Sequence, residues 1–400
     1  MRSSARPYTH IASSLMVLSA LLAGCGGATD KDPAPTPTPT PPVTVPPGPI
    51  GVTFTSPVAA NNVHDVDASV PLQITVTVNG NPAANGTPVT LTTTSSASLA
   101  PVAPTTTGGA ATSTLKSTVA GPLVVNATVT STTNTANESL KLYIRPAHQP
   151  LELLVPAYFA TGTDSPWASL TAGGASYPNV KITAIANPNS GVLTSTTTAN
   201  ADLVTAITNF KSANRKVIGY VSTLYGNGAR SEADVKATID KYIELYPGLE
   251  GFFIDEMASG SNRLAHYEAI YSYIKSKGAS LVVIGNPGIF PDPAYAAAAD
   301  VLVTFEGTAA GYQVLDPQQS SNTWVYGKAN TAQAMLAHSA DTCTAMQDTV
   351  KYANLARLNT GLVFTTDQTT NRSATTLPSY WTKLLGTVDA LNAGRALPAC

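Results

Sequence analysis

Residues 251–256, Gly-Phe-Phe-Ile-Asp-Glu, place two carboxylates directly after three large apolar side chains. Residues 301–306, Val-Leu-Val-Thr-Phe-Glu, repeat this pattern later in the chain. Short runs without a polar face are typical of strands buried on both sides, as in a parallel sheet. We therefore expect a parallel sheet in which acidic side chains follow the ends of two strands.

Similar apolar runs alternate with helical patterns from residue 150 to residue 400. The expected strands cover residues 153–159, 181–186, 216–221, 251–255, 281–285, 301–305, 324–327 and 362–366. The expected helices cover residues 201–212, 232–245, 264–277, 331–340, 345–358 and 379–392. Eight strands in about 250 residues match the size of a (β/α)8 barrel of the TIM type, with a doubly wound sheet as the alternative. The first crossover, residues 160–179, has a weak helix signal, so we expect its helix to be missing or irregular.

Active residues of a (β/α)8 barrel lie where strands end and the following loops begin. Asp255 and Glu256 end the fourth expected strand, and Glu306 ends the sixth. Acids on these strands face each other across the barrel mouth, as the carboxylate pair of a glycosidase requires. Side chains alternate along a strand, so Asp255 and Glu256 can both enter the mouth only if the chain bends there. In the alternative interpretation, these acids cap helices or pair with Lys and Arg at the rim.

Residues 1–24 have the features of a bacterial lipoprotein signal. Two arginines precede a short apolar stretch at residues 11–23, which ends in a lipobox-like Leu22-Ala23-Gly24-Cys25. We expect cleavage before Cys25 and acylation of Cys25, which would anchor an exported protein to a membrane. An ordinary cleaved signal with a chance Cys is the alternative.

Two further features of the N-terminal region concern localisation. Gly26 rather than Asp follows Cys25, so by analogy with other lipoproteins we expect the outer membrane or the cell surface. Residues 25–50 are rich in Pro and Thr and are expected to form an extended tether.

Residues 51–146 have the pattern of a small all-β sandwich. Alternating segments at residues 72–78, 89–93, 111–115 and 123–129 are separated by turn residues such as Asn-Gly and Gly-Gly. The Thr-rich motifs resemble bacterial Ig-like repeats. No acids or histidines cluster here, so we expect a spacer or presenting module, with independent ligand binding as the alternative.

The composition excludes several classes of protein. The charged fraction is 12% and the net charge is −2, without a basic cluster, so we expect no nucleic-acid partner. The sequence has no zinc-ligand spacing of His or Cys, no G-x-S-x-G elbow and no phosphate-binding Gly motif. We expect no metal and no cofactor, and a monomer. Cys343 and Cys400 remain once Cys25 is acylated, and we expect them to form a disulfide, the alternatives being free thiols or an intermolecular bond.

Five ordered motifs then identify a family. They are LLVPAYF (153–159), AIANPNSG (184–191), VIGYVSTLYG (217–226), GFFIDE (251–256) and ADVLVTFEG (299–307). In order and spacing they resemble the spherulin-4 family over about residues 150–390. This resemblance implies a glycoside-hydrolase-like barrel and cleavage of α-1,4-linked N-acetylgalactosamine or galactosamine polymers of microbial exopolysaccharides.

The resemblance also implies roles for individual residues. Asp255 would be the nucleophile or stabilising carboxylate, Glu306 the general acid/base, and Glu256 would orient them or exchange roles with Asp255. The candidates for sugar contacts are Tyr158, Asn187, Tyr220, Tyr225 and Asn286. Two functions follow: a surface-tethered endo-glycosidase, or a non-catalytic module that binds such a polymer.

Overall fold

The computed structural model describes residues 44–320, 322–369 and 374–400. The expected signal peptide, Cys25 and most of the tether lie outside these residues. No helix in this part of the chain is both long and apolar enough to cross a membrane.

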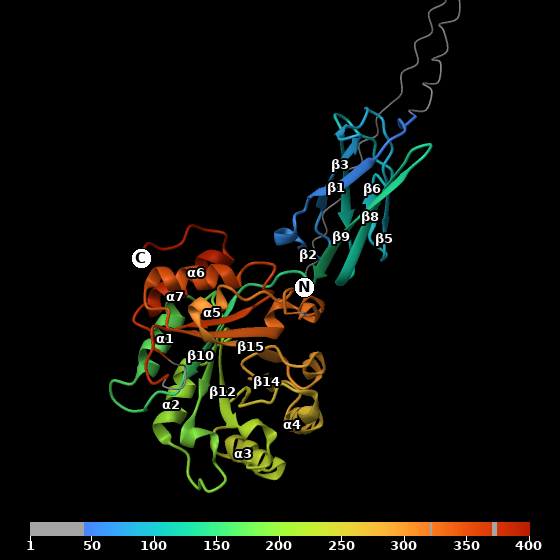
Figure 1. The fold of residues 1–400 in the computed structure, drawn as a ribbon. Coiled ribbons are helices and arrows are strands. Elements are labelled where there is room, and N and C mark those ends of the chain that lie inside the picture. The colour runs from blue at the N-terminus through green and yellow to red at the C-terminus, as the bar shows by residue number, and fades with distance from the viewer. Residues whose placement is uncertain (1–43, 321, 370–373) are drawn as a thin grey trace, which may run out of the picture. The chain divides into compact units, whose positions relative to one another are not determined.

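Residues 50–145 form two sheets that share one apolar core (Figure 1). The first sheet runs β1 (Ile50–Ser56), β3 (Val70–Val78), β7 (Ala110–Lys116) and β6 (Ser98–Ala100), with β4 (Asn81–Pro82) on β3. The second runs β2 (Val63–Asp65), β9 (Thr135–Arg145), β8 (Gly121–Thr130) and β5 (Thr90–Thr93). Ile74 and Val76 of the first sheet and Val125 of the second are fully buried in the core.

Four of these strands, β3, β5, β7 and β8, lie where the sequence pattern predicts them. The pattern misses β9, because its first half is exposed and polar and only its last four residues are all buried. It also misses the short strands β2, β4 and β6, and β1 at the start of the unit. The likeness to Ig-like repeats stays a prediction.

The second region forms a closed barrel of eight parallel strands, as predicted, and not the alternative doubly wound sheet. In barrel order the strands are β10 (Glu152–Ala157), β11 (Ile182–Ala186), β12 (Arg215–Ser222), β13 (Gly251–Asp255), β14 (Val282–Gly285), β15 (Val301–Thr308), β16 (Gln333–His338) and β17 (Leu362–Thr365). Glu152 of β10 lies opposite Leu362 of β17, and this pairing closes the barrel. All strand ends that carry candidate residues therefore meet at one mouth.

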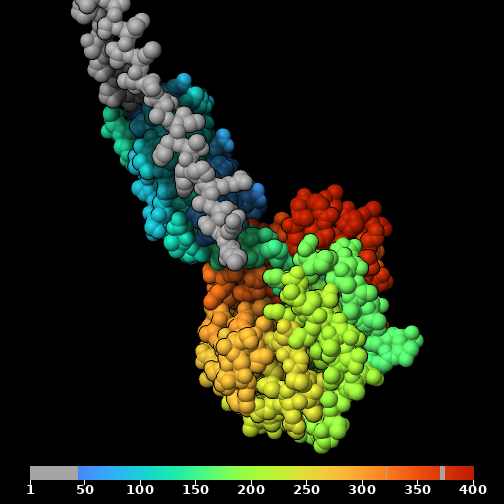
Figure 2. All heavy atoms as spheres, turned by 180° about the vertical axis from the view of Figure 1, so that it is seen from behind, coloured from blue at the N-terminus to red at the C-terminus, as the bar shows by residue number. Residues whose placement is uncertain are grey.

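Helices occupy most connections of the barrel. They are α1 (Pro166–Ser176), α2 (Ala201–Phe210), α3 (Glu232–Leu245), α4 (Leu264–Lys277), α5 (Ala309–Tyr312), α6 (Cys343–Ala353) and α7 (Trp381–Asn392). The connection from β14 to β15, described throughout, contains only the short 3-10 segment Pro293–Ala297. The space-filling view shows the atoms of the barrel region, drawn from green to red, closely packed (Figure 2).

The expectation of a missing or irregular first crossover helix is wrong, because α1 lies there. Ser165 caps α1 by accepting a hydrogen bond from Trp167 N, and the side chain of Trp167 is buried. Two glycines weaken the helix signal, yet both lie where α1 packs closely against its neighbours. A Cβ on Gly173 would come within 2.4 Å of Trp381 Nε1, and one on Gly174 within 2.7 Å of Arg215 Cδ. These glycines serve close packing rather than chain flexibility.

The seventh strand was assigned to the wrong residues. Residues 324–327 belong to the 3-10 segment Thr323–Gly327, and the helix expected over residues 331–340 is strand β16. Gln-Ala-Met-Leu-Ala favours a helix by intrinsic propensity. All five of these residues are buried, and in a barrel such a segment extends as a strand paired on both edges. Tertiary pairing outweighs propensity here.

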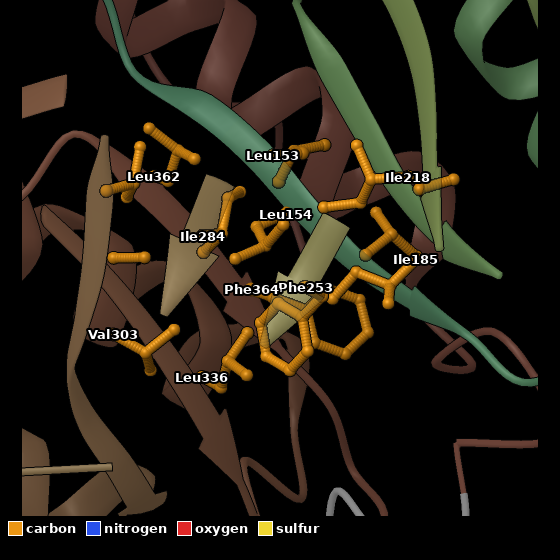
Figure 3. Close-up of a cluster of buried hydrophobic side chains, with 14 of the residues drawn as sticks. Leu153, Leu154, Ile185, Ile218, Phe253, Ile284, Val303, Leu336, Leu362 and Phe364 are labelled. Carbon is orange, nitrogen blue, oxygen red and sulfur yellow. The ribbon is translucent and has the colours of Figure 1, made fainter. Parts of the chain in front are cut away.

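Apolar side chains from the barrel strands pack into one cluster (Figure 3). Phe253, Ile284, Val303 and Phe364 are each at most 1% exposed. The barrel is therefore a packed core beneath its mouth, and it can hold the strand ends rigidly.

A disulfide joins Cys343, at the start of α6, to Cys400, the last residue. Pro398, two residues before Cys400, also contacts α6, since Gln347 Nε2 donates to Pro398 O at 2.7 Å. The bond fastens the end of the chain to the barrel.

Candidate active site at the barrel mouth

A polar hollow of about 580 Å³, the site hollow, lies at the carboxyl ends of the barrel strands. It is lined by all eight candidate residues: Tyr158, Asn187, Tyr220, Tyr225, Asp255, Glu256, Asn286 and Glu306. None of its lining residues is Lys or Arg. The ion pairs of the described residues include none to Asp255 or Glu256, and neither residue caps a helix. For Asp255 and Glu256, the arrangement therefore differs from the alternative in which the acids cap helices or pair with Lys and Arg at the rim.

The chain bends where Asp255 meets Glu256. Glu256 has a φ of 53°, in the left-handed region that a residue with a Cβ rarely adopts. Tyr225 N donates to Glu256 O at 2.7 Å, and Thr223 Oγ1 donates to the same oxygen at 2.9 Å. The bend satisfies the condition set by strand alternation, so both consecutive acids line the hollow. Strained backbone held in place by its surroundings is common at functional sites.

Asp255 accepts hydrogen bonds at both carboxylate oxygens. Tyr220 Oη donates to Oδ2, and Asn286 Nδ2 donates to Oδ1 at 2.6 Å. Burial raises the pKa of the Asp255 carboxyl, and these hydrogen bonds oppose the rise. Burial and the nearby Asp255 raise the pKa of the Tyr220 hydroxyl, so it stays protonated and acts as the donor.

Asn286 connects the two strands that carry the acids. Its Nδ2 donates to Asp255 and also to Glu306 Oε2, the latter at 2.7 Å. The two acceptor oxygens therefore lie no more than about 5.3 Å apart, which is the sum of these distances. This upper limit for one pair of oxygens is nearer to the carboxyl separation of about 5–5.5 Å that is typical of glycosidases that retain configuration than to the separation of about 6.5–9.5 Å in inverting enzymes.

Glu256 has a partner of its own. Ser222 Oγ, at the end of β12, donates to Glu256 Oε2 at 2.5 Å. The third acid is therefore held by a neighbouring strand end, apart from the bridge between Asp255 and Glu306.

The three candidate tyrosines differ in what their rings can do. Tyr220 packs on Phe253 and meets Tyr158 edge-on, with ring centroids 5.5 Å apart in the second pair. Tyr225 is 51% exposed and is the tyrosine best placed to lie against a sugar ring. Tyr220 and Asn286, predicted as sugar contacts, direct hydrogen bonds to the acids.

His338, at the end of β16, also lines the hollow but was missed from the sequence. Its Nδ1 lies 3.0 Å from Ser339 Oγ, and burial lowers its pKa, so the ring is neutral at pH 7. The misassigned helix over residues 331–340 hid this strand end. Tyr326 lies in the segment 324–327 that was expected as the seventh strand; it is buried and donates to Arg357 O at 2.7 Å. Among the described residues, no group of three or more His, Cys, Asp or Glu is arranged to hold a metal ion.

Fold and site together define a class: a parallel-barrel protein with three carboxylates at the carboxyl ends of its strands. The sequence profile of spherulation-specific family 4 matches residues 152–388. Spherulin-4 of Physarum polycephalum is 33% identical over 253 residues, which are 61% of this chain and 72% of that protein. The chain belongs to the spherulin-4 family, as its motifs predict.

Solved structures give a matching result for the fold. A crystal structure of Aspergillus clavatus Sph3 in complex with GalNAc matches with a TM-score of 0.51 and 22% identity. The match covers 60% of this chain and 98% of that one. The D00-D0 domain of intimin matches 23% of this chain and 45% of that one at 27% identity, with a TM-score of 0.19, too low to assign a fold.

Proposed function

We propose that this chain is a glycoside hydrolase that cuts within an amino-sugar polysaccharide of the α-1,4-linked N-acetylgalactosamine or galactosamine type. One observation carries the proposal: Asp255 and Glu306 are joined through Asn286 at a separation suited to displacement at a sugar. The barrel fold shared with Sph3, whose crystal structure contains GalNAc, supports the choice of sugar. The endo mode and the linkage follow from the family resemblance.

The separation of the acids favours two displacements and retained configuration. In the first, Glu306 gives its proton to the glycosidic oxygen while Asp255 attacks the anomeric carbon, and the C–O bond to the leaving sugar breaks. In the second, Glu306 takes a proton from water, whose oxygen displaces Asp255 and restores both acids.

The hydrogen bonds favour Asp255 as the nucleophile. A buried carboxylate needs donors to remain charged, and Asp255 has two, Tyr220 and Asn286. Glu256, held by Ser222, orients the reacting groups or supports charge near them. Tyr158, Asn187 and Tyr225 are left to contact sugar rings and hydroxyls.

We also propose that the protein is exported and tethered by a lipid on Cys25, at the outer membrane or cell surface, and acts as a monomer. The lipobox-like sequence and the Pro/Thr-rich residues 25–50 support tethering. Radiolabelled palmitate should enter the wild-type protein but not Cys25→Ser in the producing cell.

Hydrolysis of defined oligosaccharides tests the proposed activity. The purified full chain should release shorter products from α-1,4-linked N-acetylgalactosamine or galactosamine oligomers, read by mass spectrometry, with α-configured new ends in early NMR spectra. Asp255→Asn and Glu306→Gln should each lower kcat by about 10²–10⁴-fold, because each removes a group that transfers a proton or forms a bond. Glu244→Gln is the matched control, since Glu244 is exposed on α3 and pairs with Lys241.

Two results would contradict the proposal. Wild type that binds the oligomers without cutting them, with variants that bind equally well, identifies a polysaccharide-binding module. New reducing ends that are β-configured in early spectra would show that the enzyme inverts configuration, and Asp255 would then not be the nucleophile.

A further inference from the structure

A second polar hollow, the rim hollow, of about 760 Å³, adjoins the mouth between the loops that follow β10 and β11. It shares Asn187 with the site hollow, so one side chain borders both. Side chains of the β10 end alternate between them: Tyr158 lines the site hollow, and Ala157 and Phe159 line the rim hollow. A chain leaving the acids past Asn187 therefore reaches the rim hollow directly.

The lining of the rim hollow suits an uncharged sugar. None of the side chains that line it is charged, and its polar groups are amides and hydroxyls, among them Asn189, Asn200, Thr196 and Thr198. Amides and hydroxyls both donate and accept, as sugar hydroxyls and acetamido groups require. A phosphate, carboxylate or nucleic-acid backbone would find no cation here.

Asn187 has a side-chain hydrogen-bond acceptor that no other group of the described protein uses. Its side-chain Oδ1 is buried and accepts no hydrogen bond. Buried acceptors without partners are uncommon and costly, so each calls for an explanation. A rotation of the amide that brings it against a sugar hydroxyl would supply the missing partner.

The walls of the rim hollow are fixed before any ligand arrives. Asn189 Nδ2 donates to Thr196 Oγ1 at 2.8 Å, and Asn200 Nδ2 donates to Thr161 Oγ1 at 3.2 Å. Asn200 also caps α2 through Leu203 N at 3.0 Å. A preformed wall lowers the entropic cost of ordering side chains around a ligand.

We propose that the rim hollow is a remote subsite that binds an uncharged sugar residue of the same polymer, away from the bond that is cut. The proposal rests on the proposed function. Binding there holds longer chains across the acids, so cleavage efficiency depends on chain length.

A length series with a blocking substitution tests this subsite. For wild type, kcat/KM should rise about tenfold or more once the oligomer is long enough to reach the rim hollow, a factor that two or three net hydrogen bonds supply. Thr198→Arg fills the hollow from an exposed loop position and should remove that rise without changing kcat/KM for the shortest cleaved oligomer. Thr198→Ser keeps the space, and Thr208→Arg adds the same charge on exposed α2 outside the hollow; both should behave as wild type.

Failure of the subsite is separable from failure of the proposed function. Cleavage that does not depend on length, or a rise that survives in Thr198→Arg, would overturn the subsite alone. If wild type binds oligomers without cutting them, the proposed function fails. The subsite is then tested by Kd, which should fall with oligomer length in wild type but not in Thr198→Arg. If no oligomer is cut or bound, both are wrong.

Discussion

At the scale of single residues, Asn286 determines how the two acids carry protons. Its Nδ2 can only donate, so Asp255 Oδ1 and Glu306 Oε2 must each present a lone pair to it. An unprotonated oxygen is the stronger acceptor, so the hydrogen bond from Asn286 to Oε2 favours the Glu306 proton on Oε1, the oxygen that does not face Asn286. The sequence predicts Asn286 at the mouth as a sugar contact, and that role stays a prediction. Its contacts with the two acids could not be predicted, because spacing along the chain does not reveal which groups its amide meets.

If the chain has the proposed glycosidase activity, Tyr220→Phe should shift the pH profile of hydrolysis. The Tyr220 hydroxyl favours the charged form of Asp255, so its removal raises the pKa of Asp255 further above its ordinary value. If Asp255 attacks as an anion, activity is lost as pH falls through that pKa, and the acid limb of kcat/KM moves to higher pH. The aromatic ring remains on Phe253, so packing is kept.

The control for this change is Tyr271→Phe, which removes a similar hydroxyl from Asp300 at 2.9 Å, outside the residues that line the mouth. Its pH profile should match that of wild type. If Tyr220→Phe instead moves the basic limb of kcat/KM to higher pH, Asp255 acts as the proton donor. The role of nucleophile assigned to Asp255 is then wrong.

At the scale of elements, loops between strands and helices hold the acids in place. Arg230, buried just before α3, donates through Nη1 to Gly191 O at 2.9 Å and to Ser222 O, and through Nη2 to Thr238 Oγ1. Ser222 in turn holds Glu256. One guanidinium thus links the loop after β11, the end of β12 and helix α3.

Arg230→Met should damage both stability and turnover. Methionine fills similar space but leaves three buried acceptors unpaired, at about 1–3 kcal/mol for each one that stays dry. We expect a lower free energy of unfolding in urea and, below the transition, a kcat reduced by roughly tenfold or more, because small displacements of reacting groups are costly.

Arg230→Lys separates the two effects. It restores a cation without the planar fork, so it should recover part of the stability and less of the kcat. A full kcat in folded Arg230→Met would show that Arg230 serves stability alone.

Prediction of elements succeeded where burial and pattern agreed. Gly251–Asp255, Glu232–Leu245 and Leu264–Lys277 have the bounds that the sequence gives them. It failed at Gln333–His338, where helix-forming residues are extended by their two neighbouring strands. That failure cost the prediction of His338, since a strand end cannot be located on a segment assigned to a helix.

At the scale of the whole molecule, the order of apolar strands, helical patterns and acids along the chain is enough to predict the barrel and the mouth at which the acids lie. Nineteen of the 24 acids follow residue 150. The acids near the carboxyl ends of the fourth and sixth strands meet because parallel strands bring these ends to one mouth. The bend at Glu256 and the bridge through Asn286 depend on contacts between strands, which no single segment encodes.

The bond between Cys343 and Cys400 belongs to this scale, because it closes a loop with a sequence separation of 57 residues. Cross-linking restricts the unfolded chain, so the double variant Cys343→Ser/Cys400→Ser should lose about 2–4 kcal/mol of stability. In a domain of this size that corresponds to a Tm lower by roughly 5–15 °C, measured by calorimetry without reductant. Neither cysteine lines the site hollow, so kcat at 25 °C should equal that of wild type.

Wild type treated with reductant under denaturing conditions and refolded with reductant present is the matched control and should share the lower Tm. An unchanged Tm would mean that the tail is held by contacts such as Gln347 to Pro398 alone, and a lowered kcat would mean that the chain end supports the mouth.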